Sequence, residues 1–233
     1  MISLTSAAMT ISPASSASEE LLERVRANFV RVSERIESSG RDRSSVRIVA
    51  VTKTFGVQEI RAALALGLTT FGENYVDELC EKRRATDTLV LSWHFLGALQ
   101  TNKIARATSC ADVLSGVARE RELTRIATLS PGKSVDIQID FTKEARRNGA
   151  APEDVASLVA RARALELNVR GLMVVAPLGE AATRAAFEQT NALANELGIG
   201  ERSMGMSDDL ELACELGTTE VRLGRALFGA RVG

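Results

Sequence analysis

The sequence alternates eight times between a short apolar run and a segment with helical periodicity. The runs are rich in β-branched residues, as in 46–51 and 169–175, which is typical of parallel strands buried on both faces. The intervening segments repeat apolar residues at spacings of three and four. Parallel strands joined by crossover helices, repeated eight times, predict a closed (β/α)8 TIM barrel of the α/β class. An open doubly wound sheet would show the same alternation and is the alternative.

The eight repeats can be placed along the chain, and the predicted strands are 46–51, 69–72, 91–96, a fourth around 113–114, 135–139, 169–175, 203–206 and 221–223. The predicted helices between them are 57–66, 75–84, 100–107, 118–128, 152–165, 181–197 and 210–216. One extra helix, 19–39, precedes the first strand. Residues 1–18 are rich in Ser, Ala and Thr and lack the pattern of a secretory signal, which predicts a disordered tail. We therefore expect one barrel domain over 19–233 and no second domain.

Composition excludes several functional classes. The chain is 45% hydrophobic and 25% charged with a net charge of -1, so we expect neither a nucleic-acid surface nor a membrane-binding face. Cys80, Cys110 and Cys214 are widely spaced and form no CxxC pair, which favours free thiols in a reducing cytoplasm. A single histidine, His94, excludes a histidine-rich metal site. A cytoplasmic protein without a metal is the expectation, and we expect a monomer.

Polar residues gather at the predicted carboxyl ends of the strands. In a barrel of this class those ends share one mouth, where ligands bind. The residues at these positions are Lys53, Glu73, Asn74, His94, Ser115, Asp140, Ser203, Ser207, Arg222 and Gly224. This concentration predicts a polar site at the mouth.

Lys53 is the first candidate for chemistry, because it follows the buried run 46–51 directly. Loss of solvation at such a position lowers a lysine's pKa and frees the amine to attack an aldehyde. A snorkelling or ion-paired lysine at a strand end is the alternative. Lys103 is a competing nucleophile, but it falls within a predicted helix and away from a strand end. His94, taken alone, is typical of a hydrogen-bonded structural histidine.

A phosphate site is predicted near the last two strands. Ser207 stands at a plausible helix N-cap after the small residues of 203–207, and helix N-termini bind phosphate. Asp208 and Asp209 would repel an anion placed beside them, so it should approach from the barrel side. Gly224 lets backbone approach a ligand closely. The alternatives are an ordinary capped helix, and an ion pair between strands for the neighbouring Arg222.

Taken together, the motifs resemble those of the pyridoxal phosphate (PLP) homeostasis protein family. The resemblance runs from about residue 46 to 231 and rests on the segments AVTKT (50–54), FGENYV (71–76), WHFLG (93–97), LQTNK (99–103), RGLM (170–173), SMGMSDD (203–209), RLG (222–224) and FGAR (228–231). It implies the barrel of the alanine racemase N-terminal domain. Two segments, 115–118 and 140–149, depart from the family pattern.

The resemblance also implies a cofactor and its contacts. PLP is expected as a Schiff base on Lys53, with its phosphate at the 203–207 loop and at Gly224 and with Arg222 facing the pyridine nitrogen. The full set of expected cofactor-binding residues is Lys53, Asn74, His94, Ser203, Gly205, Met206, Ser207, Arg222 and Gly224. Partners would be PLP and PLP-dependent apoenzymes that receive it.

A carrier is favoured over a catalyst. A guanidinium can only donate, so an Arg222 at the pyridine nitrogen keeps that nitrogen unprotonated and makes the ring a weaker electron sink. Racemase chemistry tolerates this but needs a second acid/base group, which a second domain supplies in alanine racemases, and the only tyrosine here is Tyr75. We therefore expect no catalytic residue and no turnover. The alternatives are a small PLP-dependent amino-acid racemase and a barrel enzyme without PLP.

Overall fold

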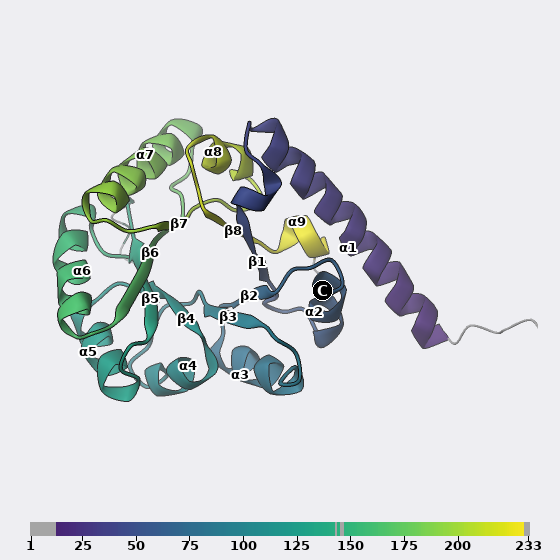
Figure 1. Ribbon diagram of the computed structural model, residues 1–233, viewed down its shortest axis with the longest axis horizontal. Helices are drawn as coiled ribbons and strands as arrows, with labels where there is room; N and C mark the ends of the chain where they lie inside the picture. The colour runs from purple at the N-terminus through teal and green to yellow at the C-terminus, as the bar shows by residue number, and fades with distance from the viewer. Residues whose placement is uncertain (1–12, 143, 145–146, 231–233) are drawn as a thin grey trace, which may run out of the picture.

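The computed structural model describes residues 13–142, 144 and 147–230, and it confirms the predicted (β/α)8 barrel. Eight parallel strands follow one another around a closed sheet in chain order, and β8 pairs with β1 to close it. Figure 1 shows the strands at the centre with the helices around them. The strands are β1 (Arg47–Val51), β2 (Thr70–Glu73), β3 (Ser92–Phe95), β4 (Val113–Val117), β5 (Ser134–Ile139), β6 (Asn168–Val174), β7 (Glu201–Ser203) and β8 (Glu220–Leu223).

The helices alternate with the strands as the sequence predicts. They are α1 (Pro13–Ser38), α2 (Val57–Leu64), α3 (Val76–Ala85), α4 (Ile104–Cys110), α5 (Glu120–Leu129), α6 (Val155–Ala164), α7 (Glu180–Glu196), α8 (Leu210–Glu215) and α9 (Arg225–Phe228), with short 3-10 turns η1 (Arg43–Ser45) and η2 (Pro152–Asp154). The hydrophobic core lies mainly between the sheet and this ring. Phe71 and Trp93, on adjacent strands, pack there with ring centroids 5.6 Å apart. Because the helices bury this outer face of the sheet, the strands are apolar on the outer face as well.

The extra helix α1 completes the helical ring. The helix after β8, α9, has only four residues, and α1 lies across α8, α9 and α2 on this side of the barrel (Figure 1). Asn28 Nδ2 donates to the carbonyl oxygen of Leu227 at 2.7 Å. Arg35 pairs with Glu211 at 2.5 Å and donates to the carbonyl oxygen of Ser207 at 2.9 Å. The predicted extra helix is thus a structural part of the barrel, and it supports the segment that carries Ser207.

Several element boundaries differ from those predicted; α4, for example, begins at Ile104 instead of residue 100, and the start of α1 and the position of β7 also differ. Residues 1–12 of the predicted tail lie outside the described residues, and residues 13–18 belong to α1, which begins before the predicted start at residue 19. The seventh strand was predicted at 203–206, and this placement was wrong, because β7 ends at Ser203. Gly205 has a φ of +97°, which turns the chain away from the sheet. Residues 204–206, predicted as part of the strand, therefore form a loop at the mouth.

The prediction that all three cysteines are free thiols was wrong. Cys80 of α3 and Cys110 at the end of α4 form a disulfide, with their Cα atoms 5.2 Å apart. They are 30 residues apart in sequence, and only the packing of α3 against α4 around the ring brings them together. Cys214 is a free, buried thiol. Cysteine spacing alone could not reveal this pairing, because Cys80 and Cys110 come together only in the folded barrel.

Candidate functional site

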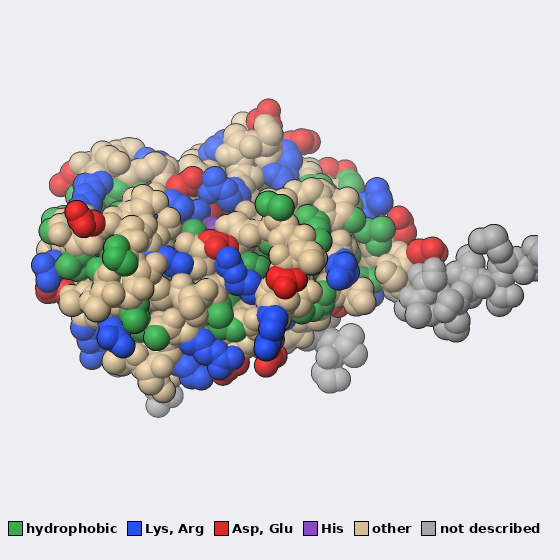
Figure 2. Space-filling model, turned by 60° about the horizontal axis from the view of Figure 1, so that its bottom comes forward, with side chains coloured by type: hydrophobic (Ala, Val, Ile, Leu, Met, Phe, Trp, Pro, Cys, Tyr) green, Lys and Arg blue, Asp and Glu red, His purple; other side chains and the backbone are tan. Residues whose placement is uncertain are grey.

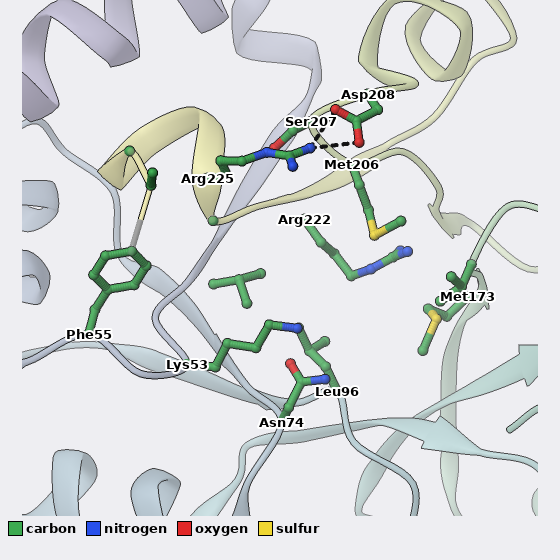
Figure 3. A pocket seen from close by; sticks show the side chains of 15 residues that line it. Lys53, Phe55, Asn74, Leu96, Met173, Met206, Ser207, Asp208, Arg222 and Arg225 are labelled. Atoms are coloured by element: carbon green, nitrogen blue, oxygen red, sulfur yellow. Dashed lines mark hydrogen bonds and ion pairs between the residues drawn. The ribbon is translucent and has the colours of Figure 1, made fainter. Parts of the chain in front are cut away.

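A cavity of about 660 Å³ opens at the carboxyl ends of the strands. Most of its lining comes from β1, β2, β6 and β8 and from the segments that follow them, as predicted for the mouth of such a barrel. Figure 3 shows these side chains around the cavity. The lining residues are Val51, Lys53, Phe55, Asn74, Leu96, Met173, Val175, Met206, Ser207, Asp208, Arg222, Gly224, Arg225, Gly229 and Ala230.

Lys53 and Asn74 stand side by side in this cavity. Lys53 comes two residues after the end of β1, and Asn74 comes directly after β2. The two strands are paired in parallel, with Val51 opposite Gly72, so their ends reach the mouth together. Figure 3 shows the Lys53 side chain extending into the cavity toward the Asn74 amide. The sequence-based prediction that an amine stands at this strand end and faces the ligand space is consistent with this placement.

Arg222 forms the floor of the cavity. It lies on β8, is only 6% exposed, and crosses beneath Met206 in Figure 3. Its Nη1 donates to the carbonyl oxygen of Ser203 at 2.6 Å and to the Ser203 hydroxyl at 2.9 Å, and Nη2 donates to the carbonyl oxygen of Val174 at 2.7 Å. Burial lowers the pKa of Arg222, yet a guanidinium keeps its proton at neutral pH.

These contacts decide between the two interpretations of Arg222. These hydrogen bonds go to neutral oxygens of β6 and β7, and they do not form the ion pair between strands that was the alternative. Three of its five N–H groups are used in this way. A buried guanidinium at the edge of a cavity, with donors left over, is suited to bind an acceptor atom of a ligand.

One rim of the cavity carries the small residues Ser207 and Gly224. Ser207 Oγ accepts a hydrogen bond from the backbone N–H of Ala226 at 3.2 Å. A Cβ on Gly224 would lie 3.1 Å from the carbonyl oxygen of Val51, so a side chain there would press on β1. The predicted phosphate-binding pair is therefore brought together, since Ser207 and Gly224 stand on adjoining segments.

Asp208 and Asp209, on the same rim, both have hydrogen-bonding partners within the protein. Asp208 forms a 2.6 Å ion pair with Arg225, and Figure 3 shows this pair at the edge of the cavity. Asp209 accepts a 2.5 Å hydrogen bond from the backbone N–H of Met206. The ion pair offsets the repulsion that Asp208 would exert on an anion. Sequence reasoning missed Arg225, although it directly follows Gly224 in the printed sequence.

Three of the predicted binding residues lie outside the cavity lining. Ser203 and Gly205 instead support Arg222, because Ser203 accepts two hydrogen bonds from its guanidinium and the Gly205 carbonyl accepts its backbone N–H at 3.0 Å. Gly205 has no room for a side chain, since a Cβ would lie 2.6 Å from that of Ala213. His94 faces the barrel interior, 2% exposed, with Nδ1 3.8 Å from Glu220 Oε1. The structure thus gives His94 a place in the interior and not at the mouth.

A buried charge network fills the barrel interior around His94. The pairing of β5 with β6 shifts register, which leaves Arg170 as an extra residue, and its guanidinium binds both Asp136 at 2.7 Å and Glu220 at 2.8 Å. Ser115 also donates to Asp136, at 2.7 Å. Burial alone would lower the pKa of Arg170, but the two carboxylates outweigh burial and raise it. One arginine therefore stabilises two buried carboxylates.

Replacing Arg170 with methionine should destabilise the fold strongly. The change leaves Asp136 buried without its cation and leaves Glu220 with the longer, 3.4 Å pair to Arg47, which costs about 3–5 kcal/mol. The matched control is Arg161→Met, because Arg161 pairs with Glu120 at the surface, with side chains 44% and 66% exposed, and exposed pairs contribute at most about 1 kcal/mol. Urea unfolding of both variants measures the difference. Equal losses in the two variants would contradict the network's role.

The imidazole of His94 should titrate below its ordinary pKa of about 6.5. Burial lowers the pKa of His94 in the folded protein, whereas the unfolded chain takes up the proton near the ordinary value. Stability should therefore fall as pH drops below about 6.5, down to the folded pKa. Because the chain has one histidine, a single imidazole signal in NMR reports the titration. A midpoint at or above the value in the denatured chain would be inconsistent with this burial.

Comparison with known proteins identifies the family. The model of the family described as "Alanine racemase, N-terminal domain" matches residues 21–232. The pyridoxal phosphate homeostasis protein of Pseudomonas aeruginosa is 38% identical over 220 residues, which cover 91% of this chain and 96% of the relative. The protein of the same name from Escherichia coli K12 is 34% identical over 224 residues, covering 88% and 95%.

Solved structures agree with this assignment. PipY of Synechococcus elongatus, solved without PLP, is 34% identical with a TM-score of 0.76 and is matched over 85% of this chain and 100% of its own. The same protein with PLP bound is 36% identical with a TM-score of 0.73. Alanine racemase of Clostridium difficile, 16% identical with a TM-score of 0.73, shares the fold over 58% of its length. This chain belongs to the pyridoxal phosphate homeostasis proteins, within the alanine racemase N-terminal domain family.

Proposed function

We propose that this protein binds PLP through the amine of Lys53 and holds it for intracellular PLP homeostasis, without turnover of its own. The observation that carries the proposal is the cavity itself, where Lys53 and the buried Arg222 face one space at the mouth of the barrel. The names of the relatives and the PLP-bound neighbour support it. PLP supplies an aldehyde that a lysine amine can bind covalently.

The polar groups of the cavity suit the three parts of PLP. Lys53 would hold the aldehyde carbon, and Asn74 lies beside it. Arg222 would donate a hydrogen bond to the pyridine nitrogen, which keeps that nitrogen unprotonated. Ser207 and the backbone at Gly224 would hold the phosphate, with Arg225 as a nearby positive charge. The apolar side chains of the lining, among them Met206, would contact the ring faces.

The proposal that the protein carries PLP without turnover rests on which side chains line the cavity. Racemisation needs a second proton donor on the face opposite the lysine, and a tyrosine serves in alanine racemases. Here the single tyrosine, Tyr75, is 57% exposed and is not a residue of the cavity lining. Arg222 at the pyridine nitrogen would further weaken the ring as an electron sink. The cavity therefore suits retention and release of the cofactor better than catalysis.

We also propose that the protein is a cytoplasmic monomer that supplies PLP to PLP-dependent apoenzymes. None of the helices in the described part of the chain is long and apolar enough to cross a membrane. Figure 2 shows Lys and Arg mixed with Asp and Glu over the visible face, without the large basic area that nucleic-acid binding favours. A reducing cytoplasm disfavours the Cys80–Cys110 disulfide, so we expect peptide mapping of thiols trapped in cells to find both cysteines reduced, and an oxidised pair would contradict this location.

Borohydride reduction should fix PLP on Lys53. Reduction of the protein prepared with excess PLP converts the lysine adduct to a stable pyridoxyl group, and mass spectrometry of the peptides locates it. Lys53→Ala should lose at least about nine-tenths of the label, because the amine that forms the bond is gone. Lys103→Ala is the control, since Lys103 pairs with Asp77 at 3.1 Å outside the cavity lining. Label that stays in Lys53→Ala would overturn the assignment.

The purified protein with PLP should not racemise amino acids faster than free PLP does. The cavity residues place no tyrosine opposite Lys53, so the second proton transfer has no matching donor. Chiral chromatography of alanine and other amino acids after long incubation measures the rate. Turnover well above that of free PLP, and lost in Lys53→Ala, would favour the racemase alternative.

A further inference from the structure

Lys53 is presented by a strained turn. The backbone N–H of Phe55 donates to the carbonyl oxygen of Thr52 at 2.9 Å, which closes a four-residue turn with Lys53 and Thr54 in its centre. Thr54 has a φ of +68°, a left-handed conformation that is unfavourable for a β-branched residue. Such strain persists only where surrounding contacts impose it, and it concentrates at functional sites.

Helix α3 supplies those contacts from two side chains one turn apart. Glu78 Oε2 accepts the backbone N–H of Thr54 at 2.9 Å. Lys82 Nζ donates to the carbonyl oxygen of Thr52 at 2.7 Å and pairs with Glu78 at 3.0 Å. Helix α3 therefore contacts the turn at Thr52 and at Thr54, the two residues that flank Lys53. Thr54 is exposed, so burial does not hold its amide in place.

A third charge, Glu73 at the end of β2, joins the turn to the barrel. Its Oε1 accepts hydrogen bonds from Lys82 Nζ and from the Thr52 hydroxyl, both at 2.7 Å. Glu73 is fully buried and Lys82 is 7% exposed. Burial, the largest influence, raises the pKa of Glu73, and the hydrogen bonds from Lys82 and Thr52 oppose it.

Stability alone does not account for these buried charges. Well-packed apolar residues commonly stabilise a fold as much as a buried ion pair does. The pair is instead directed at one backbone segment, the turn that carries the ligand-binding amine. Helix α3 is also covalently joined to α4 through Cys80, which lies between Glu78 and Lys82 in sequence. The turn is thus bound to a helix that is itself held in place.

We propose that Glu78 and Lys82 are positioning residues, which hold the turn 52–55 in its strained conformation and so fix the place of the Lys53 amine in the cavity. This inference rests on the proposed function of Lys53, and it adds a determinant of how long PLP stays bound. Loosening the turn lets Lys53 leave the geometry that suits the bound cofactor, and release becomes faster.

The first test needs no cofactor. Hydrogen–deuterium exchange of the Thr54 amide, followed by NMR in the unloaded protein, should speed up in Glu78→Ala by roughly tenfold, the size expected for losing one charged hydrogen bond. Glu78→Gln keeps an oxygen acceptor and should stay within about threefold of the parent. Lys82→Met should also speed the exchange, by releasing the other side of the turn.

Lys133→Met is the matched control for lost stability. Lys133, like Lys82, donates to backbone carbonyls, those of Thr108 and Ala111, but it is only partly buried and lies away from the mouth. Its removal should lower stability in thermal unfolding but leave the Thr54 amide as slow as in the parent. This comparison separates positioning of the turn from a general weakening of the fold.

The second test follows release of PLP from the loaded protein by its visible absorbance after dilution. Glu78→Ala should release PLP at least about fivefold faster, whereas Glu78→Gln and Lys133→Met should stay within about twofold of the parent. Exchange or release in Glu78→Ala equal to that in Lys133→Met would overturn the inference. If the parent takes up no PLP, the proposed function fails, and the exchange experiment still decides whether Glu78 and Lys82 hold the turn.

Discussion

Closure of the sheet between β1 and β8 is the constraint on which the site depends. Their parallel register sets Val49 opposite Arg222 and Ala50 opposite Leu223, so the first and last strands end at the same side of the mouth. Lys53 and Arg222, from distant parts of the chain, therefore face one cavity. The ligand site is a consequence of the closed parallel barrel.

Much of the fold and of the site could be predicted from the sequence. Local periodicity determines the helices and strands, and the parallel topology determines where the strand ends meet. The barrel and the extra helix are confirmed, and Lys53, Asn74, Met206, Ser207, Arg222 and Gly224 all line the cavity. The resemblance to a known family added the cofactor, which strand-end chemistry alone leaves open. The names of the relatives and the PLP-bound neighbour support that cofactor.

The remaining features depend on contacts between residues far apart in the sequence, which local sequence patterns do not show. The direction of a strand side chain near a register shift, as at Arg170, and the placement of His94 in the interior follow from barrel stagger. The end of β7 depends on the left-handed Gly205. Contacts between α3 and its neighbours produce both the disulfide and the support of the Lys53 turn. Sequence reasoning assigned Lys82 only to a helix, and nothing local marks it as buried.

The central claim is that one ligand bridges β1 and the β7–β8 side of the mouth. A crystal structure of the protein grown with PLP tests it most directly. We expect electron density continuous with Lys53 Nζ, a pyridine nitrogen at hydrogen-bond distance from Arg222, and a phosphate between Ser207 and Gly224. PLP bound at another lysine, or with its phosphate away from Ser207 and Gly224, would contradict the account.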